Sequence, residues 1–281
     1  MDDARPPQPE SMWRILRRTA VSAGRHRLSL IAAGVAFFAT LALFPAIATV
    51  VALYGVIADP HQVEFHLSLL RPVAPPAAFS LIEAQVSQLV AAGPVSLKFA
   101  SVVSSLIAFW AARAGIAAMV SGIDLVHSGS ESRSLPVDLL IGLALTLLMI
   151  VVTLVAVTLV VVAPAFLVWM PPGNAAALAL QALRWAIGLA SVLLALGALY
   201  RFAPHRPRRR RIAWVTTGSV LAAALWVAAS AAFSFYLSNF GDYNEIYGSL
   251  GAVAALLMWF YISAYLALLG AELNEAIGKA G

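Results

Sequence analysis

Six long apolar stretches, separated by short polar segments, dominate the pattern of hydrophobic and polar positions along this chain. A stretch of about 20 predominantly apolar residues is long enough to cross a bilayer as a helix. The stretches do not alternate apolar and polar residues, which excludes the strands of a membrane β-barrel. We therefore predict an all-α integral membrane bundle of six transmembrane helices, over residues 30–58, 95–125, 136–162, 176–202, 212–237 and 247–277.

Two segments outside these stretches have an amphipathic pattern. Residues 12–28 place apolar side chains among several arginines, and we expect this segment to lie on the membrane surface. In the loop after the first stretch, apolar residues recur at helical spacing over 77–92, between two prolines and a Gly-Pro pair. We predict a second amphipathic helix there, on the outer surface, and a plain ordered loop is the alternative.

The predicted organisation follows from these patterns. It comprises a basic amphipathic N-terminal segment at 1–29, a membrane domain at 30–277 and a short tail at 278–281. Composition agrees, because 62% of the residues are hydrophobic and only 11% are charged, against about 25% charged in soluble domains. The first apolar stretch is too long for the core of a cleavable signal, so we expect it to stay in the membrane. The absence of cysteine excludes disulfides and thiolate chemistry.

Positive charge is distributed unevenly between the two predicted sides of the membrane. If the N-terminus is inside, fourteen of the 18 lysines and arginines fall on the inner side. Because inner loops are enriched in these residues, both termini are predicted to be cytoplasmic. The densest run lies between the fourth and fifth stretches and faces anionic lipid in this topology; it consists of Arg206, Arg208, Arg209, Arg210 and Arg211. No aromatic residues interleave it, as nucleic-acid stacking would require, so no nucleic-acid partner is expected.

Arg113 is the first candidate for a functional side chain, because it lies well inside the second stretch. An arginine at membrane depth costs about 2.5–3.5 kcal/mol on insertion scales, so something must offset it. Arg113 could bind an anionic substrate group in a cavity. The alternatives are a structural ion pair, with Glu272 or Asp124 as partner, and a side chain that reaches toward the inner face.

Two further groups of polar residues lie at the predicted helix mouths. Glu272 and Asn274 occupy the cytoplasmic end of the last stretch, where the carboxylate could face a cavity, pair with an inner arginine such as Arg201, or be solvated. The outer turn before that stretch is dense in polar and aromatic groups and could form a gate. A capped turn with interfacial tyrosines is the alternative. The gating candidates in this turn are Asn239, Asp242 and Tyr243.

Signatures of enzymes are missing from the sequence. There is no P-loop, no dinucleotide-binding fingerprint, no nucleophile elbow and no metal-binding cluster of histidines and cysteines. The acidic residues are few and scattered, whereas metal-dependent nucleases need converging carboxylates. We therefore expect no catalytic residues, no metal, no cofactor and no enzymatic activity.

Several short stretches of the chain together match the pattern of a known family; they are 32–38, 43–45, 110–113, 131–133, 199–204, 236–243, 247–251 and 270–274. These residues resemble those of the YihY/BrkB family of bacterial inner-membrane proteins, once labelled ribonuclease BN. The resemblance spans about residues 14–277. Two departures stand out: residues 122–124 read Gly-Ile-Asp where Ala-Leu-Asn is expected, and His205 replaces an asparagine. The resemblance implies six membrane helices and a link to virulence, without a settled activity.

These observations favour a transporter, or a protein that handles a lipid or an anionic solute, in the bacterial inner membrane. Its support is a buried arginine, polar residues at both mouths and no catalytic set. The alternative is a non-transporting envelope scaffold that binds partners through its faces. The expected partners are the phospholipid bilayer and an anionic lipid or small solute, and homo-oligomerisation stays open.

Overall fold

The computed structural model describes residues 11–57, 83, 94–127, 135–168, 175–204, 213–239 and 249–279, and the following account concerns these residues. All regular secondary structure in them is helical. The helices are α1 (Met12–Arg25), α2 (Leu28–Ile57), α5 (Pro94–His127), α6 (Leu135–Val168), α7 (Ala175–Phe202), α8 (Thr217–Asn239) and α10 (Ser249–Gly278).

The prediction of six membrane-spanning helices is confirmed, since α2, α5, α6, α7, α8 and α10 are long and apolar enough to cross a bilayer. The fifth helix starts at Thr217 and not at residue 212. Thr216 caps it: the backbone N–H of Ser219 donates to Thr216 Oγ1 at 3.1 Å, and Ser219 Oγ accepts from the Thr216 N–H at 2.8 Å. Of the amphipathic helix predicted at 77–92, Glu83 is helical and the rest lies outside the described residues.

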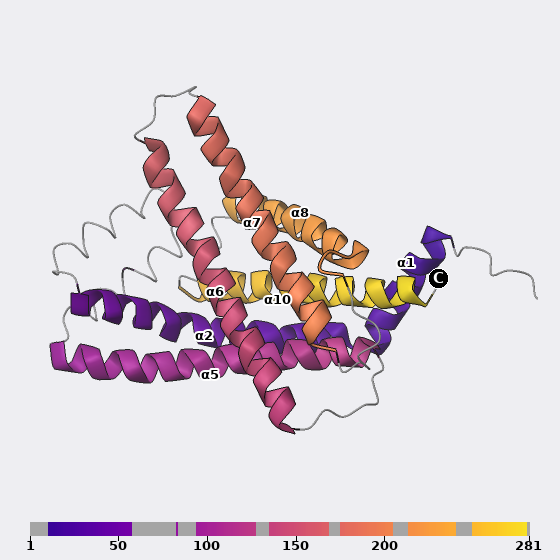
Figure 1. Ribbon diagram of the computed structural model, residues 1–281, viewed down its shortest axis with the longest axis horizontal. Coiled ribbons are helices and arrows are strands. Elements are labelled where there is room, and N and C mark those ends of the chain that lie inside the picture. Colours follow the sequence, from indigo (N-terminus) through magenta and orange to yellow (C-terminus); the bar gives the residue numbers. More distant parts are fainter. Residues whose placement is uncertain are drawn as a thin grey trace, which may run out of the picture.

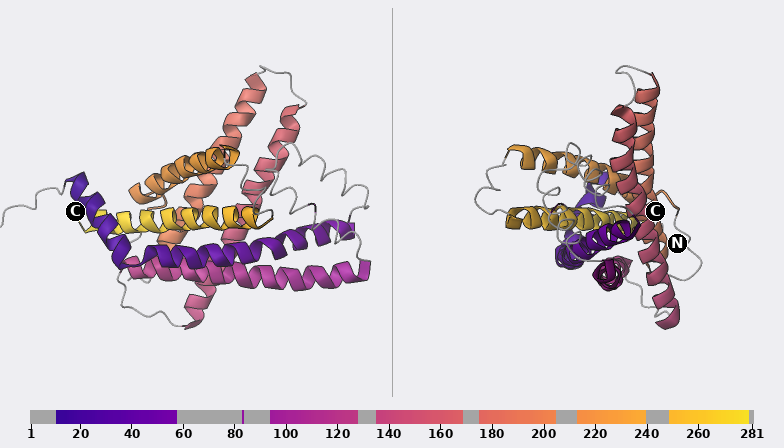
Figure 2. Two further views of the ribbon diagram at one scale, coloured as in Figure 1. Left: turned by 180° about the vertical axis from the view of Figure 1, so that it is seen from behind. Right: turned by 90° about the vertical axis from the view of Figure 1, so that its left-hand side faces the viewer.

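The helices form two groups that cross each other. Helices α2, α5 and α10 run side by side, and α8 packs on α10 (Figure 1). The antiparallel pair α6 and α7 crosses the first group steeply, as the end-on view in Figure 2 also shows. Helix α6 contacts α5, and α7 contacts α8. Each helix of the crossing pair therefore packs against one helix of the first group.

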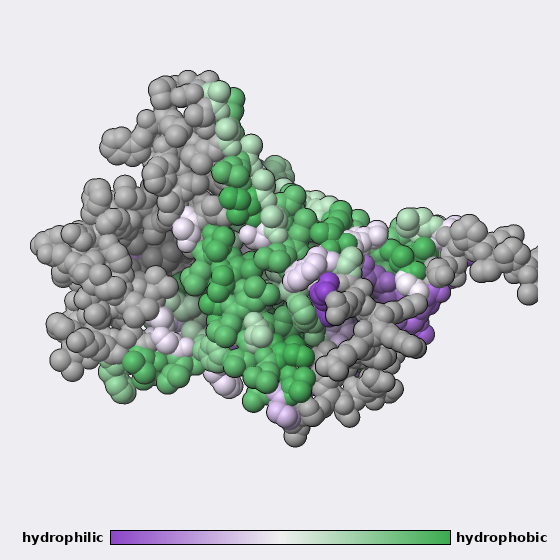
Figure 3. All heavy atoms as spheres, viewed as in Figure 1, coloured by the Kyte–Doolittle hydropathy of each residue, from purple (hydrophilic) through white to green (hydrophobic). Residues whose placement is uncertain are grey.

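Large apolar side chains lie mainly on the outside of this bundle. Phe37, Leu106, Leu139, Trp185 and Phe235 are all exposed, and in Figure 3 hydrophobic residues cover the middle of the visible face. Hydrophilic residues gather near α1 and the C-terminal end of α10. An apolar exterior of this extent is unstable in water and fits a hydrocarbon solvent, as expected for membrane helices.

The interior is built largely from small residues, which lets the helix backbones approach closely. One close approach joins Gly218 of α8 to Gly270 of α10, where a Cβ on Gly270 would come within 2.7 Å of the Gly218 carbonyl oxygen. Small residues at a crossing point are the usual way in which membrane helices associate. Tyr200 of α7 is fully buried at this point and donates a hydrogen bond to the Ala267 carbonyl at 2.6 Å.

Removal of this hydroxyl tests the junction of α7 with α10. We expect Tyr200→Phe to lower the free energy of unfolding by about 1 kcal/mol, the usual net value of one buried hydrogen bond. The measurement is unfolding of the purified protein in mixed micelles with increasing sodium dodecyl sulfate, followed by circular dichroism. An unchanged transition would show that the hydroxyl contributes nothing to the packing of these helices.

Helix α1 packs against the end of α10. Its Ile15 is buried against Leu273 and Ala276, while Trp13 and Leu16 on the opposite side are 74% and 42% exposed. Helix α1 therefore has a docked face that the sequence pattern did not reveal, and its position on the membrane surface stays a prediction. The chain then turns sharply into α2 at Arg27, which has a φ of 51°.

Candidate functional site

Arg113 lies well inside the length of α5, on the face that meets α6. It is half-buried and fourteen residues from the end of α5, about 21 Å along the helix axis. Its guanidinium rests against Gly142 of α6, where an added Cβ would be 2.9 Å from Cζ and 3.0 Å from both terminal nitrogens. The missing side chain at position 142 therefore makes room for the cation.

Neither acid proposed as a partner of Arg113 is shown in contact with it. Glu272 pairs elsewhere, and no hydrogen bond or ion pair joins Arg113 to another described residue. Gly142 contributes no charge that could offset the cost of the guanidinium. Gly142 was not predicted as part of the site, because a single glycine in an apolar helix does not indicate which side chain packs against it.

Glu272 is buried, at 4% exposure, and is held by a histidine from the other end of the chain. His26, in the turn after α1, places Nδ1 2.9 Å from Glu272 Oε2. The observed partner of Glu272 is therefore His26, whereas Arg201, the inner arginine suggested as a partner, lies over the Trp214 ring, 5.2 Å from its centroid. His26 was not a candidate because it lies among arginines in a segment expected only to contact lipid.

Asn274 has a structural contact on each side of its amide. Its Oδ1 accepts a hydrogen bond from the Gly218 N–H at 2.8 Å, and its Nδ2 donates to Thr216 Oγ1 at 2.8 Å. These are groups at the first turn of α8, where backbone N–H groups have no partner inside the helix. In this arrangement Asn274 ties the end of α10 to the start of α8.

A second histidine joins α5 to the same region. His127 Nδ1 is 2.7 Å from the Ile123 carbonyl oxygen, so this nitrogen must carry the proton. Its Nε2 is buried without a hydrogen-bond partner among the described residues and lies 3.7 Å from Glu275 Oε2. The start of α2 and the ends of α5 and α10 therefore meet, together with the start of α8, at one end of the bundle.

The meeting of these ends agrees with the predicted topology, in which they share one side of the membrane. Which compartment that side faces stays a prediction. Of the three gating candidates, Asn239 is the last residue of α8. Asp242 and Tyr243 lie outside the described residues, so their role stays a prediction. The same holds for the basic run of Arg206, Arg208, Arg209, Arg210 and Arg211.

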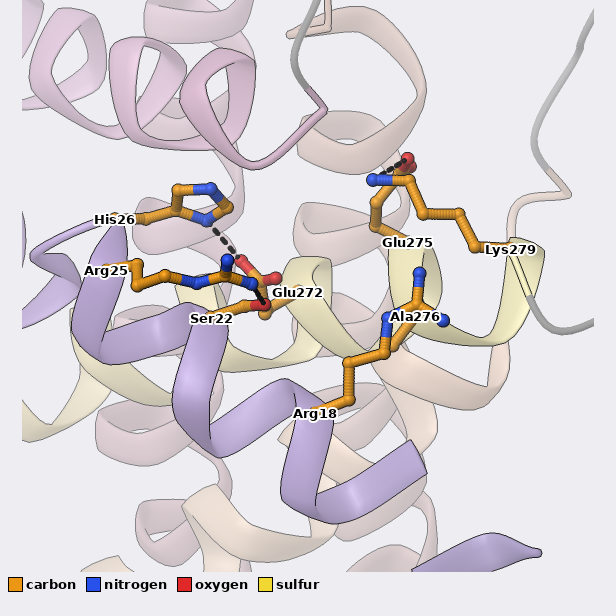
Figure 4. A pocket seen from close by; sticks show the side chains of 8 residues that line it. All are labelled: Arg18, Ser22, Arg25, His26, Glu272, Glu275, Ala276 and Lys279. Atoms are coloured by element: carbon orange, nitrogen blue, oxygen red, sulfur yellow. Dashed lines mark hydrogen bonds and ion pairs between the residues drawn. The ribbon is translucent and has the colours of Figure 1, made fainter. Parts of the chain in front are cut away.

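A charged cleft of about 270 Å³ opens between α1 and the end of α10 (Figure 4). Its two carboxylates are paired, Glu272 with His26 at 2.9 Å and Glu275 with Lys279 at 3.2 Å. The Arg25 guanidinium donates to Ser22 Oγ at 3.1 Å. Among the described residues, no group of three or more histidines, cysteines or acids could hold a metal ion. The lining residues are Arg18, Ser22, Arg25, His26, Glu272, Glu275, Ala276 and Lys279.

Comparison with known proteins places the chain in a family. The model of the family described as "Virulence factor BrkB" matches residues 19–280. A "Putative ribonuclease-like protein YfkH" of Bacillus subtilis (strain 168) is 31% identical over 257 residues, which are 88% of this chain and 89% of that protein. No solved structure matches the chain.

Shorter matches link the chain to proteins named only as membrane proteins. A "UPF0761 membrane protein" of Tolumonas auensis is 35% identical over 36% of this chain and 31% of its own length. Another, from Chlorobium limicola, is 38% identical over 31% of this chain and 19% of its own length. The chain thus spans about a third or less of these two relatives. Together with the family match and the six apolar helices, they lead to one conclusion: the chain belongs to the BrkB family of multi-pass membrane proteins.

Proposed function

We propose that this protein handles an anionic amphiphile within the inner membrane, as a transporter or lipid-handling protein, and that Arg113 binds the anionic group. The observation that carries the proposal is the guanidinium of Arg113 on Gly142, with no acid on it among the described residues. A cation at this depth is costly without an anion. A phosphate or carboxylate of a ligand supplies that charge and accepts bidentate hydrogen bonds from arginine.

The surroundings of Arg113 favour a ligand with apolar tails. Trp110, one turn before Arg113 on α5, is 60% exposed, and Leu139, one turn before Gly142 on α6, is 61% exposed. These side chains flank the contact and face outward, where lipid tails lie in a membrane. An amphiphile could therefore place its charged group on Arg113 while its tails stay in hydrocarbon.

Native mass spectrometry of the full chain released from its own membrane tests this assignment. We expect Arg113→Ala to reduce a specifically bound anionic lipid about tenfold, the loss of one charge-assisted contact. Gly142→Ala should have a similar effect, because its Cβ displaces the guanidinium while leaving it charged. The matched control is Gly188→Ala, since nothing lies within 4 Å of a Cβ there.

The outcomes separate binding from folding. A ligand site is supported if all four proteins unfold at the same point and only the Arg113 and Gly142 variants carry less lipid. The same lipid in all four proteins contradicts it, and so does loss of the folded protein in Arg113→Ala. A flip assay with a fluorescent anionic lipid in liposomes then tests movement.

The second candidate is an envelope scaffold without transport. Its support is the structural use of Glu272 and Asn274, which hold α1 and α8 to the end of α10 rather than facing an open path. Under this reading, no ligand is lost in the Arg113 variant and a protein partner co-purifies. Neither candidate includes nuclease activity, which incubation of the purified protein with RNA and divalent metal tests directly.

A further inference from the structure

We propose that the charged cleft between α1 and the end of α10 is a second anion site, which binds the phosphate of an anionic lipid headgroup. It is separate from Arg113, which is about 21 Å along α5 from the helix end at His127, the residue that lies 3.7 Å from Glu275 of the cleft. The inference therefore does not rest on the proposed function, and either can fail alone.

The charges of the cleft favour an anion. Three permanent cations, Arg18, Arg25 and Lys279, line it against two carboxylates. Both carboxylates already have cationic or histidine partners across or beside the cleft, at 2.9 Å and 3.2 Å. With histidine counted as neutral, the formal charges of the lining sum to one positive charge, and a volume of about 270 Å³ accommodates a phosphate group.

Arg25 is the side chain that is best placed to contact the ligand. It contacts the neutral hydroxyl of Ser22 at 3.1 Å, and no carboxylate pairs with it among the described residues. Ser22 is itself buried, at 7% exposure, which fixes the position of that hydroxyl. Figure 4 shows both side chains beside the His26–Glu272 pair, on the α1 wall of the cleft. A phosphate there can accept from the guanidinium in the forked geometry that arginine favours.

The position of α1 indicates a lipid as the source of the phosphate. The helix whose arginines line the cleft also exposes Met12, Trp13 and Leu16, at 63%, 74% and 42%. Tryptophan and aliphatic residues beside arginines are typical of helices that lie at the headgroup level of a bilayer. A cleft opening beside such a helix lies where lipid phosphates are concentrated.

The test measures lipid binding by native mass spectrometry of the full chain in detergent, with phosphatidic acid or phosphatidylcholine added. We expect Arg25→Gln to weaken phosphatidic acid binding about tenfold. The control is Arg14→Gln, which removes the same charge from an exposed position of α1 outside the cleft lining. It should stay within about twofold of wild type, because only general attraction is lost. Phosphatidylcholine should bind weakly to all three proteins.

Three results would overturn the proposal. Equal losses in the Arg25 and Arg14 variants mean nonspecific attraction to a basic helix. Equal binding of phosphatidylcholine and phosphatidic acid means that the headgroup is not recognised. Displacement of phosphatidic acid by an equal concentration of inorganic phosphate means that the ligand is the free anion and not a lipid. Reduced binding of added phosphatidic acid by Arg25→Gln, with the lipid that co-purifies from the membrane retained in that variant, shows that this cleft and the Arg113 position are separate.

Discussion

Gly270→Ala is expected to lower the free energy of unfolding by about 2–3 kcal/mol, the upper part of the range for overpacking. The new Cβ would lie 2.7 Å from the Gly218 carbonyl oxygen and 2.8 Å from Ala222 Cβ, and against the Tyr200 hydroxyl. The Gly218 carbonyl oxygen is part of the α8 backbone and the Ala222 Cβ is bonded directly to it, so neither atom can rotate away from the new Cβ. Helices α8 and α10 must therefore separate, which also strains the Tyr200 contact to Ala267.

Unfolding in sodium dodecyl sulfate, followed by circular dichroism, measures this loss. Gly188→Ala is the matched control, because its Cβ meets nothing within 4 Å. We expect it to be neutral or stabilising by up to about 1 kcal/mol, since alanine restricts the unfolded chain and favours helix. Equal transitions for the two variants would refute the close approach of α8 and α10.

His26→Ala is expected to cost about 2 kcal/mol of stability. Removing one partner of a buried hydrogen bond leaves the other group unsatisfied and costs about 1–3 kcal/mol, more for a charged group. Here Glu272 is 5% exposed and His26 is 25% exposed, so solvent offsets part of the loss. The contact joins the turn after α1 to α10, and we expect α1 to become sensitive to protease at its arginines as well.

A double-mutant cycle with Glu272→Ala isolates the pair from other effects of each change. The double variant should be more stable than the sum of the single losses indicates, because it leaves no buried carboxyl group without its hydrogen-bond partner. Additive losses would show that His26 and Glu272 stabilise the fold through other neighbours. Arg14→Gln serves again as the reference for a change on α1 that touches neither residue.

The six helices were predictable because a membrane helix satisfies its own backbone hydrogen bonds within one segment. Apolar length alone therefore places each helix, and the observed bounds differ from the predicted ones mainly at helix ends. The start of α8 is the clearest case. The apolar pattern begins at residue 212, but the helix begins at Thr217, after the cap that Thr216 and Ser219 form.

The candidate site was predictable only in part. Arg113, Glu272 and Asn274 stood out because polar residues are rare at membrane depth, but their partners did not follow from that signal. Glu272 contacts His26, which is 246 positions away in the chain. Asn274 contacts Thr216 and Gly218 of another helix. No local pattern specifies contacts over such separations.

By itself the sequence determined that this chain forms membrane helices, which segments form them and where its positive charge lies, because hydrophobicity and charge act on each segment alone. Only the tertiary structure decided that Gly142 makes room for Arg113, that His26 holds Glu272, and that α1 and α10 enclose a charged cleft. The physical reason is that an apolar helix face is in an apolar environment whether it contacts lipid or another helix, so hydrophobicity does not select which helices associate. The pairing of helices therefore depends on the fit of small residues and on a few polar contacts between distant segments.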